Sequence, residues 1–205
     1  MLRTSLTAAL VLAASLPAAA SITGTTGMAS QIGPPASCFP TALITPIVLC
    51  WDEQQGRGTS ALPVDITVNP SIVTTGGVGA TPGVLAGIFD SHFLHFDFQG
   101  APAVIGTVSF NNPIVGVAYQ DTFIDLSDSF GAFGTAYPTS FPTRGWNQIG
   151  SIAISGNTIS FTLTPNAAGA IDPEQMRVFT AVPAPGTIAL AGLGGLAFIR
   201  RRRAV

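Results

Sequence analysis

Three aspartates, Asp121, Asp125 and Asp128, lie within eight residues of one another, directly after a segment with the pattern of a β-strand. Carboxylate oxygens are the ligands that Ca²⁺ prefers, and extracellular sites bind this ion at millimolar concentrations. The spacing matches neither an EF-hand nor a repeat-type calcium loop. Two interpretations stay open: a weak Ca²⁺ site on these three residues, or a solvated acidic loop without a metal. The sequence predicts no other cofactor.

Both histidines lie in one segment, residues 91–97, where aromatic and polar residues alternate. This alternation predicts a strand, so His92 and His95 should point to opposite faces and cannot share a metal ion. His95 and Asp97 share a face, which allows a hydrogen bond between them. No G-x-S-x-G nucleophile motif occurs in the chain. We therefore predict no catalytic residue and no enzyme. A secreted hydrolase stays open as a second alternative, because paired carboxylates meet in space and not in sequence.

The segments that must position these residues are short and rich in Val, Ile, Thr and Phe, with Gly, Pro and Asn between them. This pattern is typical of an all-β fold, and no segment of the body shows a sustained helical period. Residues 21–40 are expected to be a loose lead-in to a body at residues 41–181. We expect strands at residues 42–51, 64–73, 84–98, 104–110, 114–119, 149–155, 158–163 and 175–181.

The clearest element is a hairpin at residues 151–163, with Gly156 and Asn157 as its two-residue loop. This loop sets Ile154 opposite Ile159 and places the large apolar side chains on one face of the hairpin. A second sheet must cover that face. We therefore predict an antiparallel β-sandwich, or jelly-roll-like, body.

Charge is sparse and unevenly distributed. Only 9% of the 205 residues are charged, and no lysine occurs. Residues 21–181 hold ten acidic residues against three arginines, a formal charge of −7. Such a body has no electrostatic footprint for nucleic acid. The same segment holds 32 Ser and Thr residues, and neutral hydroxyl-rich surfaces suit sugar contacts as well as they suit an ordinary exported protein.

Residues 1–20 follow the order of a secretory signal peptide. Arg3 gives a positive start, residues 6–16 are apolar, Pro17 ends the apolar segment, and three alanines supply the small side chains that a signal peptidase needs. We predict cleavage between Ala20 and Ser21, which exports the body.

Export bears on the two cysteines of the chain, Cys38 and Cys50. No further Cys or His lies nearby at the spacing of a metal site. In an oxidising compartment, two cysteines twelve positions apart are typical of a disulfide that closes a small loop. Such a bridge would stabilise the fold by roughly 2–3 kcal/mol. We predict a Cys38–Cys50 disulfide.

The C-terminus has three consecutive parts: a proline-containing tetrapeptide, a charge-free apolar segment at residues 187–199 and an arginine cluster. Counted from the tetrapeptide, a helix here reaches roughly 27 Å, close to the ~30 Å core of a bilayer. The cluster obeys the positive-inside rule and would stop transfer at the cytoplasmic face. We predict a transmembrane sorting helix within residues 182–205. The tetrapeptide is Val182, Pro183, Ala184 and Pro185, and the cluster is Arg200, Arg201, Arg202 and Arg203.

This tail resembles the PEP-CTERM sorting signal, which is also called the ice-binding protein C-terminal domain. Ala184 stands where the family pattern has Glu, so the tail is a VPAP variant. The resemblance implies that an exosortase, a membrane-embedded cysteine transpeptidase, reads the tail and passes the body to the cell surface. It also implies a bacterium that makes extracellular polysaccharide.

These features predict a protein that the C-terminal helix holds in the inner membrane before processing and that then reaches the cell surface or extracellular matrix. A structural or adhesive role is the first expectation. A glycan-binding, lectin-like module, dependent on Ca²⁺ or not, is the alternative. The expected partners are signal peptidase, the exosortase, the membrane and extracellular polysaccharide, and not nucleic acid.

Overall fold

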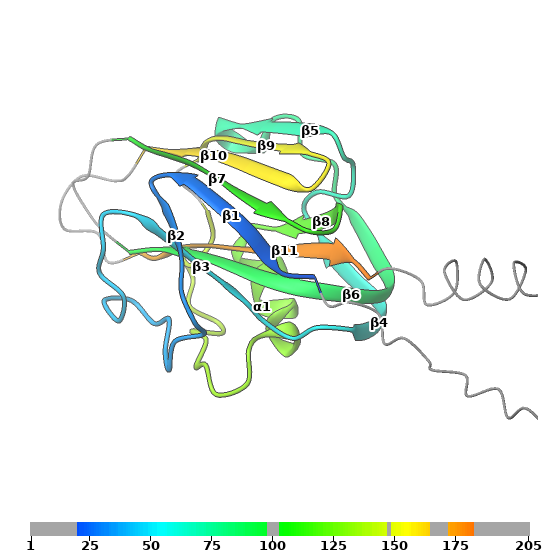
Figure 1. Cartoon of the computed structure of the whole chain (residues 1–205), viewed down its shortest axis with the longest axis horizontal. Helices are drawn as coiled ribbons and strands as arrows, with labels where there is room; N and C mark the ends of the chain where they lie inside the picture. The colour runs from blue at the N-terminus through cyan, green and yellow to red at the C-terminus, as the bar shows by residue number, and fades with distance from the viewer. Residues whose placement is uncertain (1–19, 98–102, 147–148, 165–171, 183–205) are drawn as a thin grey trace, which may run out of the picture. The chain divides into compact units, whose positions relative to one another are not determined.

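The described part of the chain consists mainly of two β-sheets, one above the other (Figure 1). The structure is a computed structural model and describes residues 20–97, 103–146, 149–164 and 172–182. Sheet A has the strand order β1-β7-β10-β9-β5, and sheet B has the order β2-β3-β6-β11-β8, with β4 also paired to β6. Apart from the parallel pair β2–β3, the strand pairs are antiparallel. The predicted all-β, antiparallel class is confirmed.

The strand bounds place β6 at the centre of the architecture, because it pairs with β4 along its first half and with β3 along its second. Sheet A consists of β1 (Ile22–Gly27), β5 (Ser71–Thr74), β7 (Val104–Phe110), β9 (Ile149–Ser155) and β10 (Thr158–Leu163). Sheet B consists of β2 (Ala29–Gln31), β3 (Val48–Asp52), β4 (Arg57–Val64), β6 (Gly83–Phe96), β8 (Ile114–Ala118) and β11 (Glu174–Ala181). The helical elements are η1 (Thr75–Gly77), α1 (Asp121–Leu126) and η2 (Asp128–Phe130).

The predicted hairpin is strands β9 and β10, with the predicted register. Ile154 pairs with Ile159, and Gly156 takes a positive φ of 61°, which suits glycine in the tight loop. The inward side chains Ile152 and Phe161 are at most 2% exposed. The Gly156-Asn157 pair therefore predicted the turn correctly, and the hydrophobic alternation predicted the face that the hairpin buries.

Apolar side chains fill the space between the sheets, and we call this cluster the inter-sheet core. Phe161 and Val108 of sheet A contribute to it, together with Leu94 and Val178 of sheet B. Each fully buried side chain of this size stabilises the fold by about 1.5–3 kcal/mol. This core joins the two layers.

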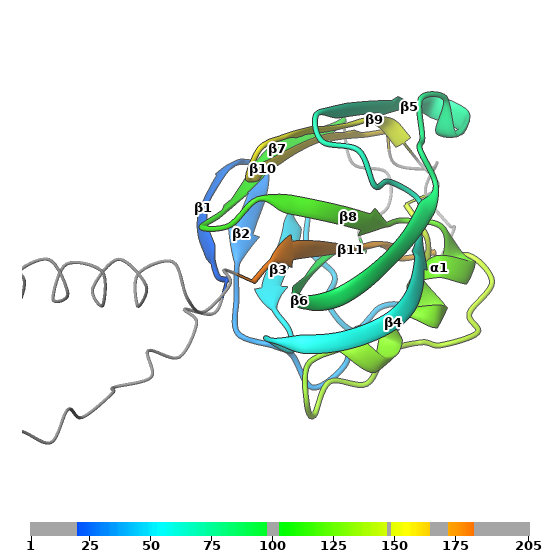
Figure 2. The same cartoon turned by 90° about the vertical axis from the view of Figure 1, so that its right-hand side faces the viewer.

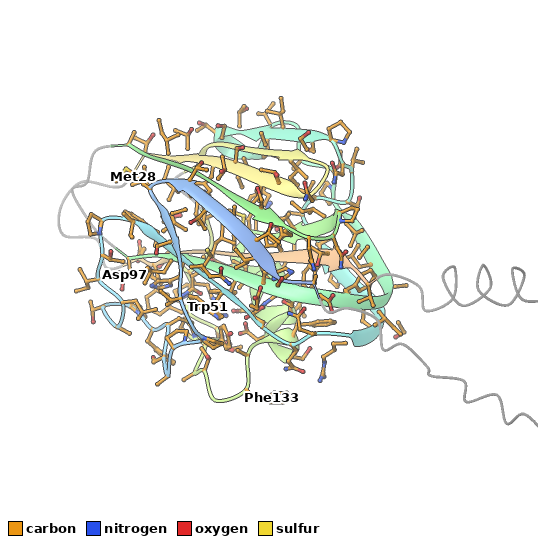
Figure 3. All side chains as sticks on the ribbon, viewed as in Figure 1. Met28, Trp51, Asp97 and Phe133 are labelled. Atoms are coloured by element: carbon orange, nitrogen blue, oxygen red, sulfur yellow. The ribbon has the colours of Figure 1, made fainter. Side chains whose placement is uncertain are left out.

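A second cluster, the outer core, covers the other side of sheet B, where α1 and the neighbouring loops lie (Figure 2). Trp51, labelled in Figure 3, contacts Phe93 with ring centroids 5.1 Å apart. Phe179 meets Phe130 edge to face at 5.3 Å, and Ile124 of α1 is fully buried beside them. Sheet B is thus buried on both faces, which explains why β6 carries apolar or aromatic residues on both.

The expected loose lead-in at residues 21–40 is wrong for its first part. Residues 22–27 form β1 at the edge of sheet A, paired with β7, and residues 29–31 form β2 beside β3. Only Ile22 of β1 is buried, so the strand lacks the apolar alternation by which sequence patterns reveal strands. Its hydroxyl side chains face outward, and Thr26 exchanges a 2.6 Å hydrogen bond with Thr107.

The predicted disulfide is also wrong, because both cysteines are free and buried. Cys50, on β3, points into the inter-sheet core, whereas Cys38 belongs to the outer core on the other side of sheet B. The sheet itself therefore separates the two sulfur atoms. Cys38 Sγ donates to the Ala136 carbonyl and Cys50 Sγ to the Ser30 carbonyl, each at 3.5 Å. Burial raises the pKa of each thiol to about 12.

We expect thiol titration of the purified protein to detect no reactive thiol in the folded state and two in denaturant, because only the exposed thiolate reacts. A reducing agent should leave Tm unchanged. If Tm falls on reduction, or if the denatured protein shows no thiol, the two cysteines form a disulfide after all.

Candidate functional site

Arg177, on β11, is fully buried and holds a network of hydrogen bonds in the outer core. Its Nε donates to Glu53 Oε2 at 2.6 Å, its Nη2 donates to Glu53 Oε1 at 3.0 Å, and its Nη1 donates to Ser127 Oγ at 2.6 Å. Glu53 also accepts from Ser91 Oγ at 2.6 Å and from Tyr137 Oη at 2.5 Å. Burial lowers the pKa of Arg177, but the Glu53 carboxylate outweighs burial and keeps that pKa above its ordinary value.

Arg144 extends this network to two of the aspartates that the sequence singled out. Its Nη1 lies 2.8 Å from Asp125 Oδ1 and 2.7 Å from Asp128 Oδ2. Asp128 also pairs with Arg177 at 3.2 Å. Burial raises the pKa of Asp128, but the hydrogen bonds and charge of Arg144 and the charge of Arg177 outweigh burial, so this pKa lies below its ordinary value. Three carboxylates, those of Glu53, Asp125 and Asp128, thus share two arginines.

The three aspartates proposed as Ca²⁺ ligands do not converge on one site. Asp125 and Asp128 face Arg144, whereas Asp121 Oδ1 accepts a hydrogen bond from the Gly145 backbone. The segment expected to be a loop is the short helix α1 followed by η2. Among the described residues no group of three or more His, Cys, Asp or Glu side chains could hold a metal ion. The calcium interpretation gains no support from this geometry.

The two histidines point to opposite faces of β6, as predicted, and both are fully buried. His92 Nδ1 lies 2.7 Å from Asp52 Oδ1, and its Nε2 lies 3.0 Å from Thr180 Oγ1. His95 Nδ1 lies 3.1 Å from Gln175 Nε2, so His95 accepts this hydrogen bond. Both rings are buried although they point to opposite faces, because sheet B is covered on both sides.

Asp97 accepts a hydrogen bond from the Thr41 backbone, and no hydrogen bond between Asp97 and His95 occurs in the described structure. Burial, assisted by the charge of Arg144, lowers the pKa of His95 to about 3. His95 is therefore neutral at ordinary pH.

This pKa makes stability depend on pH. The unfolded chain binds a proton at His95 near pH 6.5, whereas the folded chain binds it only near pH 3, so acid favours unfolding between these values. Lowering the pH from 7 to 5 should reduce the free energy of unfolding by about 2 kcal/mol. Urea unfolding at several pH values measures this loss. In the His95→Gln variant the loss should largely disappear, and an unchanged pH slope would contradict the assignment.

A pocket of about 320 Å³ lies where β8 leads into α1, next to η1. The carboxylate of Asp65 shapes this crossing, because its Oδ2 accepts from the backbone of Tyr119 at 2.7 Å and of Gln120 at 2.9 Å. The Trp146 backbone then donates to the Tyr119 carbonyl at 2.7 Å. The pocket is lined by Gly76, Gly77, Tyr119, Gln120, Asp121, Thr122 and Trp146.

Two buried polar atoms of the pocket residues have no hydrogen-bond partner among the described residues: the Tyr119 hydroxyl and Trp146 Nε1. Both atoms are shielded from solvent, so a ligand reaches them only after a local movement of the pocket wall. A β-carbon on Gly77 would come within 3.2 Å of the Tyr119 hydroxyl, so this glycine lets the chain approach the ring closely. Burial raises the pKa of Asp121, opposed chiefly by the Gly145 hydrogen bond.

Sequence reasoning singled out the three aspartates of these two sites but missed the residues that surround them. Arg144 and Arg177 are two of only three arginines in residues 21–181, and such rare charges in an apolar chain are the signal that was available. Tyr119 and Trp146 gave no signal, because a single aromatic residue after a strand is indistinguishable from an ordinary core residue.

The comparison with known families concerns the tail. Residues 181–203 match the model of the PEP-CTERM protein-sorting motif, which confirms the resemblance seen in the sequence. The motif implies processing by an exosortase and sorting to the cell surface. No curated protein and no solved structure matches the chain.

The two targeting segments fall almost wholly outside the described residues, which begin at Ala20 and end at Val182. The predicted signal peptide and transmembrane sorting helix are therefore sequence predictions. Within the described ranges, no helix has the length and apolar character needed to cross a membrane.

Proposed function

We propose that this chain is a structural or adhesive component of the cell surface or polysaccharide matrix, exported by a signal peptide and released or transferred by an exosortase. The observation that carries the proposal is the PEP-CTERM motif at residues 181–203. Inner-membrane anchoring by the tail precedes processing. Extracellular polysaccharide is the partner that surrounds the mature body.

The described body has the features of a stable extracellular domain. Sheet B is buried on both faces, and the two arginines of its outer core are paired with carboxylates. The outer face of sheet A is rich in hydroxyl groups, such as Thr107, Ser160 and Thr162, which can exchange hydrogen bonds with hydrated polysaccharide.

Inactivating the exosortase of the host tests the proposal. The full-length chain should then stay in the inner-membrane fraction and disappear from the surface fraction, while an exported protein without such a tail keeps its distribution. Equal amounts of the chain at the surface with and without the enzyme would contradict it.

A second candidate function, glycan binding, draws support from the pocket between η1 and α1. Tyr119 and Trp146 are buried in its wall, and a local movement of the wall would expose their rings and two donors without partners among the described residues; Asp121 and Gln120 add acceptors. Sugars are recognised by such combinations of apolar surface and hydrogen-bonding groups. Of the described lining residues only Asp121 is acidic, so the pocket lends no support to the hydrolase alternative. That the chain is no enzyme stays a prediction.

Titration with neutral polysaccharide from the host tests this candidate. Tyr119→Phe keeps the ring and loses the hydroxyl donor, and Trp146→Phe replaces the indole by a smaller aromatic ring without the N–H donor, so each should weaken binding about tenfold. Ile88→Val changes an exposed side chain of β6, outside both the pocket and sheet A, and is the control that should bind normally. Binding that ignores both pocket variants would contradict the assignment.

A further inference from the structure

Asp90, on β6, is a buried carboxylate that none of the sites above uses. It is 1% exposed, and each of its oxygens accepts one backbone hydrogen bond. Gly56 donates to Oδ1 at 2.6 Å, and Ala20 donates to Oδ2 at 2.6 Å. Asp90 thus ties the start of the described chain to the turn before β4.

No ion pair joins Asp90 to an arginine or histidine of the described chain. Arg57, the arginine next to this turn, donates to Gln54 instead. A buried carboxylate without a cation is costly, because two neutral hydrogen bonds replace only part of its hydration. A positive charge beside Oδ2 would therefore stabilise the buried Asp90 carboxylate.

We propose that the mature chain begins at Ala20 and that its α-ammonium group is the missing cation of Asp90. The inference rests on the proposed export, because hydrolysis of the Ala19–Ala20 peptide bond is what turns this amide nitrogen into an amine. Water is consumed, Ala19 keeps the new carboxylate, and the Ala20 nitrogen takes up protons to become the ammonium. The nitrogen already lies 2.6 Å from the carboxylate, so the ion pair needs no rearrangement.

This inference moves the sequence-based cleavage point by one residue. The small-x-small rule favours a cut after Ala20, because a cut after Ala19 leaves Pro17 at the earlier small position. The folded body argues for the earlier cut, since Ala20 itself is 2% exposed. A chain beginning at Ser21 would lose that buried methyl group, and its ammonium would face Asn111 Oδ1, 2.9 Å away, in place of Asp90.

Amine chemistry gives a sharp test, because the chain has no lysine and the α-amino group of the mature protein is its only amine. The chain is expressed at full length, exported and purified, and its first residue is determined by N-terminal sequencing. The folded protein is then labelled with an amine-reactive ester, beside the same protein in denaturant. Asp90→Asn removes the charge that holds the ammonium, and the exposed Arg57→Ala is the matched control.

We expect N-terminal sequencing to begin at Ala20. We also expect the ester to label the folded protein at least tenfold more slowly than the denatured protein, because burial protects the α-amino group from the reagent. Asp90→Asn should lose most of this protection and Arg57→Ala should keep it. A first residue of Ser21, or equally fast labelling when folded, overturns the inference and leaves export intact. A surface protein that still carries residues 1–19 also overturns the inference, whereas a chain that is found in the cytoplasm and not at the surface overturns export itself. If Asp90→Asn does not fold, sequencing and labelling of the wild-type protein still decide.

Discussion

Replacing Arg177 by alanine is expected to lower the free energy of unfolding by about 3–5 kcal/mol, a large part of the stability of an ordinary domain. The guanidinium is fully buried, makes two hydrogen bonds to Glu53, and lies 4.8 Å from the centre of the Phe93 ring. Its removal leaves the Glu53 carboxylate in the outer core without a cation. Urea unfolding of the purified protein, followed by tryptophan fluorescence, measures the loss.

Two further variants show whether charge or volume causes the loss. Arg57→Ala removes an exposed arginine whose guanidinium donates to Gln54 and lies 5.7 Å from the centre of the Phe130 ring, and it should change stability by at most about 1 kcal/mol. Arg177→Met combined with Glu53→Gln removes both charges and should be more stable than Arg177→Met alone. If Arg177→Ala loses no more than Arg57→Ala, the buried network does not stabilise the fold.

Replacing Pro183 and Pro185 together by alanine is expected to leave the tail on most molecules. Proline fixes φ near −65° and has no backbone N–H, so the double substitution removes both features from the tetrapeptide that the sequence predicts as the sorting signal. We expect an exosortase that reads these prolines to process the alanine variant poorly. The fraction of chains that keep the arginine cluster, measured by mass spectrometry, reports the effect.

Ala184→Glu is the matched control for this experiment, because it changes the same tetrapeptide toward the family pattern and keeps both prolines. It should be processed at least as completely as the wild-type chain. Full processing of the double-alanine variant would show that the prolines are not read and would contradict the sorting role assigned to this tetrapeptide.

The hairpin at residues 151–163 shows where sequence reasoning succeeds. Its loop and its alternation point to the same register, and a one-residue slip would have exposed Ile152 and Phe161. The sorting motif of the tail could also be predicted from the sequence, because its three parts follow a fixed order and need no tertiary contact to be recognised.

The wrong disulfide prediction has a clear physical cause, which is that sheet B has a core on both sides. Cys38 and Cys50 are close in sequence, yet the sheet stands between them, and no spacing rule contains that information. Asp125 and Asp128 look like a metal site until Arg144 reaches them from a distant segment. Long-range partners of this kind decide a site, and a single sequence does not specify them.

The intact mass of the chain purified from the cell surface tests the central claim most directly. The account predicts a mature protein that begins at Ala20 and lacks Arg200, Arg201, Arg202 and Arg203. A surface protein whose mass includes the arginine cluster would contradict exosortase processing and would make the tail a permanent membrane anchor.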